Sequence, residues 1–93
     1  MDKDRAEIIS INCLSFIAAD EKYLAGYLNL TGTDIYQLKK NTENPDEMPS
    51  ILASVLDYLM QNETYLIEFS EVYEVDPTDI QKARRLFPGA DLF

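Results

Sequence analysis

Carboxylates supply most of the reactive groups in this sequence, and four of them lie close together. The four are Glu63, Glu68, Glu71 and Glu74. On one helix they could form a general acid–base pair, or they could attract a cationic partner. Because Val72 and Tyr73 are expected to belong to the buried face of the same helix, we interpret these glutamates as a solvated surface rather than as a catalytic pair.

Few other residues could support catalysis or metal binding. The chain has no histidine and one cysteine, so an imidazole base and a cluster of soft metal ligands are both missing. The acidic residues Glu43, Asp46 and Glu47 do not follow the ligand order of a calcium-binding loop. The sequence therefore predicts a protein without enzymatic activity, metal or cofactor. Cys13 lies in an apolar stretch and cannot form an internal disulfide, which fits a reduced cytoplasmic protein.

Charge is distributed unevenly along the chain. Of the net charge of −9, residues 41–81 contribute −10, because they include ten acidic residues and no Lys or Arg. An acidic surface repels nucleic acids and membranes and attracts basic proteins. We therefore expect a protein-interaction module that binds a basic partner through the four glutamates. Solubility alone is the simpler explanation of the same charge.

The one basic cluster lies near the C-terminus and consists of Lys82, Arg84 and Arg85. Cations in the last turn of a helix are stabilised by the helix dipole, which is a sufficient structural role. The alternative is docking of this cluster on the acidic stretch, within one chain or between the chains of a homo-oligomer. Such docking would weaken as salt screens the charges.

Residues 24–40 are typical of a helix-turn-helix unit. The second helix would present Tyr36, Gln37, Lys39 and Lys40, as a recognition helix does in the DNA major groove. Two lysines are a small supply of positive charge in an acidic protein, and phosphate neutralisation provides most non-specific DNA affinity. A DNA-associated regulator is therefore the second hypothesis for this chain.

Residues 88–93 form an acidic and apolar tail. Its end, Asp91, Leu92 and Phe93, resembles the end of the short peptides that bacterial proteins insert into the sliding clamp, but the residues before it do not match that motif. Packing of the tail against the core is the better interpretation.

Apolar residues are spaced as in helices along the whole chain. This spacing predicts an all-α fold, a compact bundle of five or six helices in a single domain of residues 1–93. The helices over residues 4–19 and from about Pro49 onward carry wide apolar bands and should be central. A polar loop over residues 42–48 divides the chain near its middle.

Capping residues mark several expected helix starts. Asp20, Asn62 and Asp76 should cap the second, fifth and sixth helices, and a short third helix should hold Ile35 and Leu38. The fifth helix should bury one clean face, made by Tyr65, Leu66, Phe69, Val72 and Tyr73.

The two halves of the chain align as a pseudo-repeat. The halves are residues 6–41 and residues 48–87. Adding 42 to a residue number, a shift that we call the repeat offset, places Ile9 on Ile51 and Tyr23 on Tyr65. A further insertion of three residues places Asp34 on Asp79. This alignment predicts two three-helix halves packed around a pseudo-twofold axis.

A small-ligand carrier is the third hypothesis, and it requires a pocket between the two halves. Such a pocket would be lined by Tyr23, Tyr27, Tyr65 and Phe69. Aromatic residues at helical spacing are more often part of the core, which is the interpretation that we prefer.

Several segments of the chain together resemble a known family. They are Leu14–Asp20, Tyr27–Gly32, Val55–Leu59 and Val75–Pro77. They resemble a small, mainly alphaproteobacterial family, domain-of-unknown-function family 3572, over most of residues 6–87. The resemblance implies a bacterial, cytoplasmic, helical protein and implies no activity or site residue. The chain departs from the family in being rich in Tyr and Asn and in its acidic loop over residues 42–48.

Overall fold

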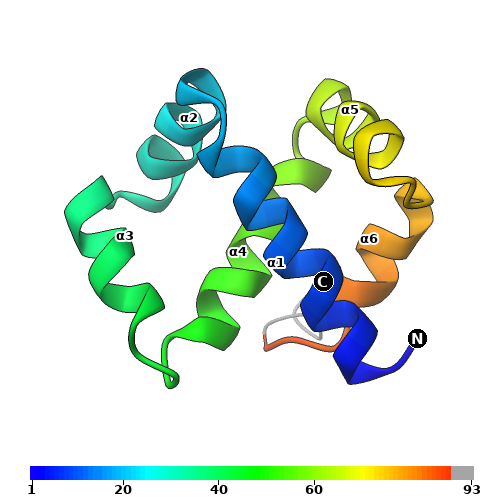
Figure 1. Cartoon of the computed structure of the whole chain (residues 1–93), viewed down its shortest axis with the longest axis horizontal. Helices are drawn as coiled ribbons and strands as arrows, with labels where there is room; N and C mark the ends of the chain where they lie inside the picture. Colours follow the sequence, from blue (N-terminus) through cyan, green and yellow to red (C-terminus); the bar gives the residue numbers. More distant parts are fainter. Residues whose placement is uncertain (89–93) are drawn as a thin grey trace.

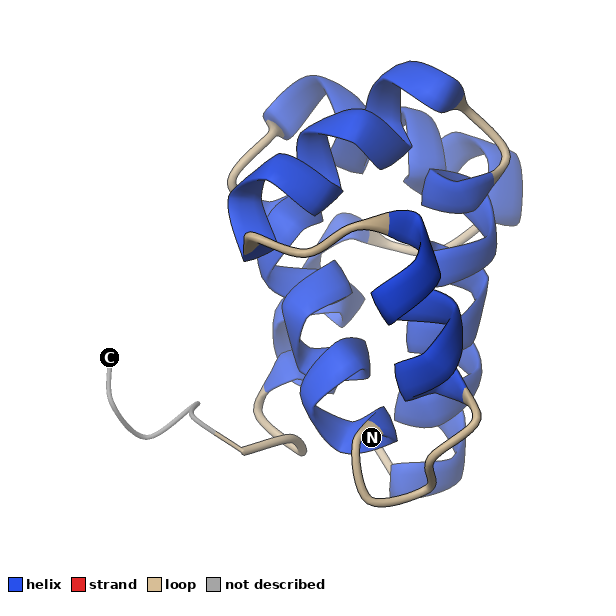
Figure 2. Ribbon diagram, turned by 90° about the vertical axis from the view of Figure 1, so that its left-hand side faces the viewer, coloured by secondary structure: helices blue, strands red, loops and turns tan. Residues whose placement is uncertain are grey.

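Six α-helices joined by short loops make up the computed structural model, which describes residues 1–88 (Figure 1 and Figure 2). They are α1 (Lys3–Ala18), α2 (Glu21–Thr31), α3 (Ile35–Thr42), α4 (Met48–Met60), α5 (Glu63–Tyr73) and α6 (Pro77–Arg84). No strand occurs in this part of the chain. The all-α bundle expected from the apolar spacing is confirmed.

Helices α1 and α4 cross at the centre of the molecule, as their wide apolar bands predict (Figure 1). Small residues are part of the buried side of α1: Ala6 and Ser10 are both fully buried, and the Ser10 hydroxyl donates a hydrogen bond of 2.7 Å to the Ala6 carbonyl. The apolar band of α1 is not buried throughout, because Ile8 and Ile11 are exposed. Ile11 instead lines a surface groove of about 290 Å³ beside the start of α4.

Aspartates cap four of the helices, and the first of them, Asp2 at the start of α1, accepts a hydrogen bond from the Arg5 amide. The carboxylate of Asp20 accepts hydrogen bonds from the Lys22 and Tyr23 amides, and Asp34 and Asp76 cap α3 and α6 in the same way. Each cap satisfies a first-turn amide that has no partner within the helix. The predicted capping of α5 by the Asn62 side chain is wrong, because this side chain accepts no first-turn amide. Asn62 holds the N-cap position, but its side-chain amide donates to the Tyr58 carbonyl at 2.8 Å.

The repeat offset relates the two halves of the chain throughout. It maps α2 onto α5 and α3 onto α6, residue for residue at both ends of each helix. The predicted three-residue insertion is therefore wrong. The cap Asp34 corresponds to the cap Asp76 rather than to Asp79, because the cap fixes the helix start and thereby places Leu38 and Ile80 at equivalent buried positions.

Aromatic rings in the core repeat this symmetry. Phe16 lies 5.4 Å from Tyr23 and 5.5 Å from Phe69 between ring centroids, and the equivalent distances from Tyr58 are 5.9 Å to Tyr65 and 5.7 Å to Tyr27. Tyr23 and Tyr65 correspond to each other and lie 4.2 Å apart, so the pseudo-twofold axis passes between them. The helix bounds and the ring distances are consistent with the predicted arrangement of two three-helix halves.

The two halves differ in how their third helices pack. Helix α6 packs against both α1 and α4, whereas α3 packs mainly against α4 and stands at the edge of the molecule (Figure 1). Ile80 and Ala83 of α6 are fully buried, but Leu38 is the only buried residue of α3. Ile35, which the sequence placed beside Leu38, is 43% exposed. The symmetric halves therefore present different outer surfaces.

Candidate functional site

The predicted acidic residues of α5 lie on its outer surface. Glu63, Glu68, Glu71 and Glu74 are all exposed, and two aliphatic side chains lie among them. Ile67 is 46% exposed and Val72 is 63% exposed. We call these six residues the α5 outer face. It combines negative charge with apolar area, the composition that suits a partner that is both basic and apolar.

The expectation that Val72 belongs to the buried face of α5 is wrong. Phe69 and Ser70 are buried, and the Ser70 hydroxyl donates to the Leu66 carbonyl at 2.8 Å. The buried stripe is therefore turned toward Ser70, which leaves Val72 on the opposite edge of the helix. Ser70 is polar and therefore gives no hydrophobic signal in the sequence. Its burial is tolerated because its hydroxyl is satisfied by the backbone of its own helix.

Helix α2 occupies the equivalent position in the other half, and its outer surface has few charges. The repeat offset matches Glu68, Glu71 and Glu74 with Gly26, Asn29 and Gly32, while Glu63 alone is matched by an acid, Glu21. A helix in this position of the fold is therefore formed without those three carboxylates. The acidic character of the α5 outer face is not a requirement of the architecture.

Glu74 ends α5 in the left-handed region, with φ 55°. Its counterpart Gly32 ends α2 with φ 69°. Both backbone amides donate to the carbonyl four residues earlier, so the two helix ends have the same geometry. A side chain at such a φ costs conformational energy that glycine avoids. The chain therefore retains a glutamate where the fold itself favours glycine.

One of the four glutamates also has a structural contact. The Tyr23 hydroxyl donates a hydrogen bond of 2.6 Å to the Glu68 carboxylate. This bond, together with burial and the negative charge of Glu68, raises the pKa of Tyr23 to about 12. The contact joins α2 to α5, so Glu68 contributes to the fold as well as to the α5 outer face.

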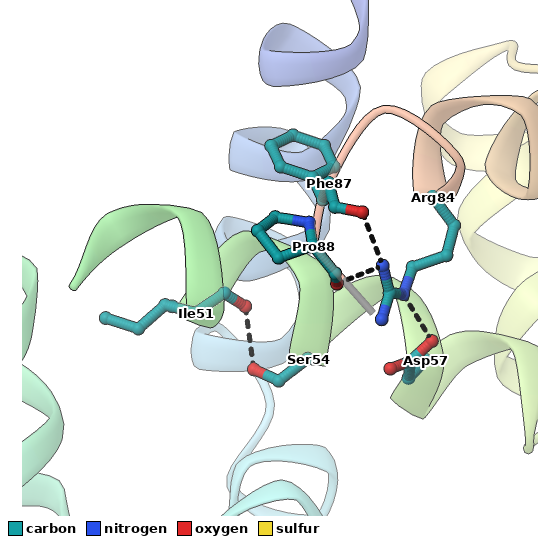
Figure 3. Close-up of polar contacts among 6 residues, drawn as sticks. All are labelled: Ile51, Ser54, Asp57, Arg84, Phe87 and Pro88. Atoms are coloured by element: carbon teal, nitrogen blue, oxygen red, sulfur yellow. Dashed lines mark hydrogen bonds and ion pairs between the residues drawn. The ribbon is translucent and has the colours of Figure 1, made fainter. Parts of the chain in front are cut away.

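The basic cluster is partly engaged within the molecule. The Arg84 Nε donates to Asp57 Oδ1 at 2.7 Å, and its Nη1 donates to the carbonyls of Phe87 and Pro88 at 3.2 and 2.8 Å (Figure 3). Lys82 lies 3.8 Å from Asp79. Arg84 thus docks on the acidic stretch within one chain, which is one of the two alternatives for this cluster, and its side chain is only 11% exposed.

The residues of the nucleic-acid hypothesis all lie on the outer side of α3. Tyr36 is 73% exposed, and Gln37, Lys39 and Lys40 are exposed as well. Gln37 is also held within the helix, because its side-chain amide donates to Asn41 Oδ1 at 2.9 Å. The structure therefore places these side chains together, with two cations among them.

The aromatic residues of the ligand-carrier hypothesis form part of the core. Tyr23, Tyr27 and Phe69 are buried, and the Tyr27 hydroxyl pairs with Ser54 Oγ at 2.6 Å. The fourth, Tyr65, is half-buried. Three of the four rings thus fill the core, as the preferred interpretation predicted, and the four do not together line the pocket that the ligand-carrier hypothesis requires.

A surface pocket that sequence reasoning missed lies beside Tyr65. Its volume is about 360 Å³, and its lining includes Gly26, Asn29, Tyr58, Gln61, Asn62 and Tyr65. We call it the Tyr65 pocket. Gly26 is required here, because a Cβ atom at this position would collide with the Tyr58 hydroxyl. One feature of the sequence could have indicated this pocket: the repeat offset places the small residue Gly26 on the much larger Glu68.

The remaining expectations concern metals, the free thiol and the tail. Within residues 1–88, no group of three or more His, Cys, Asp or Glu side chains could hold a metal ion. Cys13 is fully buried, and burial raises the pKa of its thiol. Asp91, Leu92 and Phe93 lie outside the described residues. No helix of the described part is long and apolar enough to cross a membrane.

Comparison with known proteins identifies the family. The model of the family described as Protein of unknown function (DUF3572) matches residues 3–90, so the chain belongs to this family. No curated protein and no solved structure matches the sequence.

Proposed function

We propose that this member of the DUF3572 family is a non-catalytic, cytoplasmic protein-interaction module that binds a basic protein through the α5 outer face. The observation that carries the proposal is the difference between α5 and α2. Three carboxylates of α5 stand where α2 has glycine or asparagine, although the two helices hold equivalent positions in the fold.

Each component of the α5 outer face has a physical part in binding. The glutamates attract a basic surface during diffusional encounter, which raises the association rate and selects partners by charge. Ile67 and Val72 provide exposed aliphatic area whose burial contributes to affinity. Glu74 adds a carboxylate at the end of the helix in spite of its left-handed backbone.

Cytoplasmic residence and the absence of catalysis are supported by composition. The single cysteine is buried and unpaired, as is common in a reducing compartment. The chain has no histidine, and the carboxylates of the α5 outer face lie on an exposed helix rather than in a cleft. This environment suits recognition by charge.

Affinity capture with matched charge variants tests the proposal. The tagged protein is used to capture partners from a nuclease-treated lysate of its native host, and the captured proteins are identified by mass spectrometry. Two variants are compared, Glu71→Lys with Glu74→Lys on α5, and Glu43→Lys with Glu47→Lys in the loop before α4. All four residues are exposed, and both variants change the net charge equally.

We expect a stoichiometric protein that is retained by the loop variant, released by high salt, and lost with the α5 variant. Equal loss with both variants would show a general effect of net charge and contradict the proposal. Recovery that depends on nucleic acid and disappears with Lys39→Ala and Lys40→Ala would instead favour the DNA-associated regulator.

A further inference from the structure

We propose that the Tyr65 pocket binds a carboxylate group of the size of a glutamate side chain. The ligand is either a small organic acid or an acidic side chain of another protein, and both present the same group. The inference does not depend on the α5 outer face having a basic partner. It rests on the pseudo-twofold symmetry, which relates this pocket to a site where the chain itself places a carboxylate.

The equivalent site in the other half is occupied by Glu68. There the Tyr23 hydroxyl donates to the Glu68 carboxylate at 2.6 Å. The repeat offset maps Tyr23 onto Tyr65 and Gly26 onto Glu68. Tyr65 therefore adjoins a glycine where Tyr23 meets a glutamate. The Tyr58 hydroxyl lies where a Cβ atom at position 26 would be, and Gly26 lines the pocket beside it.

The rings around the two sites are arranged alike. The centroid distance from Tyr23 to Phe16 is 5.4 Å, and that from Tyr65 to Tyr58 is 5.9 Å. Tyr23 and Tyr65 contact each other across the pseudo-twofold axis, with 4.2 Å between their ring centroids. Tyr65 therefore has the same arrangement of aromatic neighbours as Tyr23, although Tyr23 is buried and Tyr65 is half-buried.

The Tyr65 pocket has lost the negative charges that surround Tyr23. Glu68 and Asp20 both raise the pKa of Tyr23, and Glu71 lies one turn beyond Glu68. The counterparts of Asp20, Glu68 and Glu71 are Asn62, Gly26 and Asn29, and all three counterparts line the pocket. No lining residue is ionisable at neutral pH. An incoming carboxylate therefore meets fewer like charges than Glu68 does in its own site.

Hydrogen-bond donors are available in the pocket. The Tyr65 hydroxyl has no hydrogen-bond partner among residues 1–88, and Asn29 and Gln61 provide side-chain amides. The first turn of α5 also lacks a side-chain acceptor, because the Asn62 amide donates to Tyr58. In α2 the Asp20 carboxylate accepts from the two equivalent backbone amides. The pocket thus offers donors where the other half has carboxylates.

A titration followed by amide NMR tests the proposal on the full chain. The probe is propionate, which reproduces a glutamate side chain from Cβ outward, at constant ionic strength maintained with NaCl. Propionamide is the uncharged control. We expect saturable chemical-shift changes at Asn29, Gln61, Asn62 and Tyr65 with propionate, and an affinity at least tenfold lower with propionamide. A response that does not saturate, or that is equal for both compounds, overturns the proposal.

Variants localise the response. Tyr65→Phe removes the hydroxyl and should weaken propionate binding several-fold. Gly26→Glu combined with Tyr58→Phe copies the other half, where Glu68 is accompanied by Phe16, and should abolish binding because the new carboxylate fills the site. Tyr58→Phe alone leaves the pocket open and is the matched control. Propionate binding that is unchanged in Tyr65→Phe overturns the proposal, whether or not the double variant folds.

Two peptides distinguish the sources of the carboxylate. Acetyl-Gly-Glu-Gly-amide binding at least tenfold more tightly than propionate would support an acidic side chain of a protein as the ligand. Equal affinities would support a small organic acid. Acetyl-Gly-Gln-Gly-amide differs only in charge, and binding equal to that of the glutamate peptide overturns the assignment of a carboxylate.

Discussion

Glu74 occupies a backbone conformation that favours glycine, and its counterpart in the fold is a glycine. We expect Glu74→Gly to raise the free energy of unfolding by about 1 kcal/mol, because relief of left-handed strain exceeds the entropy gained by the unfolded chain. Urea denaturation measures this change. Glu71→Gly in the interior of α5 is the control and should lower the same quantity by about 0.5–1 kcal/mol. A destabilised Glu74→Gly protein would show that the side chain contributes to folding.

The contact between Arg84 and Asp57 is the shortest ion pair among the described residues, with 2.7 Å between Nε and Oδ1. We expect Asp57→Asn to lower the free energy of unfolding by about 2 kcal/mol, because Arg84 is nearly buried and loses its charged acceptor. Asp79→Asn removes two long pairs, of 3.9 Å with Arg5 and 3.8 Å with Lys82, whose cations are more than half exposed, and an acidic charge in the first turn of α6. It should cost less than about 1 kcal/mol. Equal losses in chemical denaturation would contradict this ranking.

Helices α3 and α6 have equal length and equivalent positions, but their packing differs. Leu38 alone is buried on α3, and a hollow of about 210 Å³ with a mixed polar and apolar lining lies between α3 and the adjoining helices. Two residues of α6 are fully buried, and Arg84 ties its end to α4. We expect the amides of α3 to exchange with deuterium roughly tenfold or more faster than those of α6. Equal protection would show that α3 opens only with the whole domain.

Helix starts were predictable where one side chain determines them. Asp20 and Asp76 each accept a first-turn amide, as predicted, which is a local interaction that short sequence patterns report. Asp2 and Asp34 cap α1 and α3 in the same way but were not predicted as caps. Asn62 shows the limit of such patterns, because its amide is used by the Tyr58 carbonyl of the preceding helix. The edges of the buried faces were harder to predict, since Ser70 rather than Val72 is buried on α5 through packing that no single helix specifies.

At the scale of the whole molecule, the pairing of two halves was predictable because the repeat offset matches apolar positions that pack on each other. The alignment of α3 with α6 was not predictable, because matching residue types placed Asp34 on Asp79 rather than on the equivalent cap Asp76. The α5 outer face and the Tyr65 pocket also differ in how well the sequence predicts them. The acidic residues of α5 could be identified from charge alone, whereas the Tyr65 pocket depends on a Gly26 whose neighbour, Tyr58, is distant in sequence.

Net charge should oppose compactness in this molecule, and salt should relieve that effect. The molecule measures 31 × 27 × 23 Å and carries a net charge of −9, of which −10 lies in residues 41–81. The Debye length is about 30 Å at 0.01 M salt and about 8 Å at 0.15 M. Repulsion therefore acts across the whole molecule at the lower salt concentration and only between near neighbours at the higher.

We expect the free energy of unfolding to rise by about 1 kcal/mol between these two NaCl concentrations. Urea denaturation measures this without adding charge of its own. Glu71→Gln with Glu74→Gln reduces the net charge to −7 by neutralising two exposed side chains, and should reduce the salt effect in proportion. A fall in stability with salt would mean that attractive pairs such as Arg84 with Asp57 outweigh the repulsion of the acidic stretch. The acidic stretch, α5 included, would then carry no net electrostatic cost to the stability of the fold.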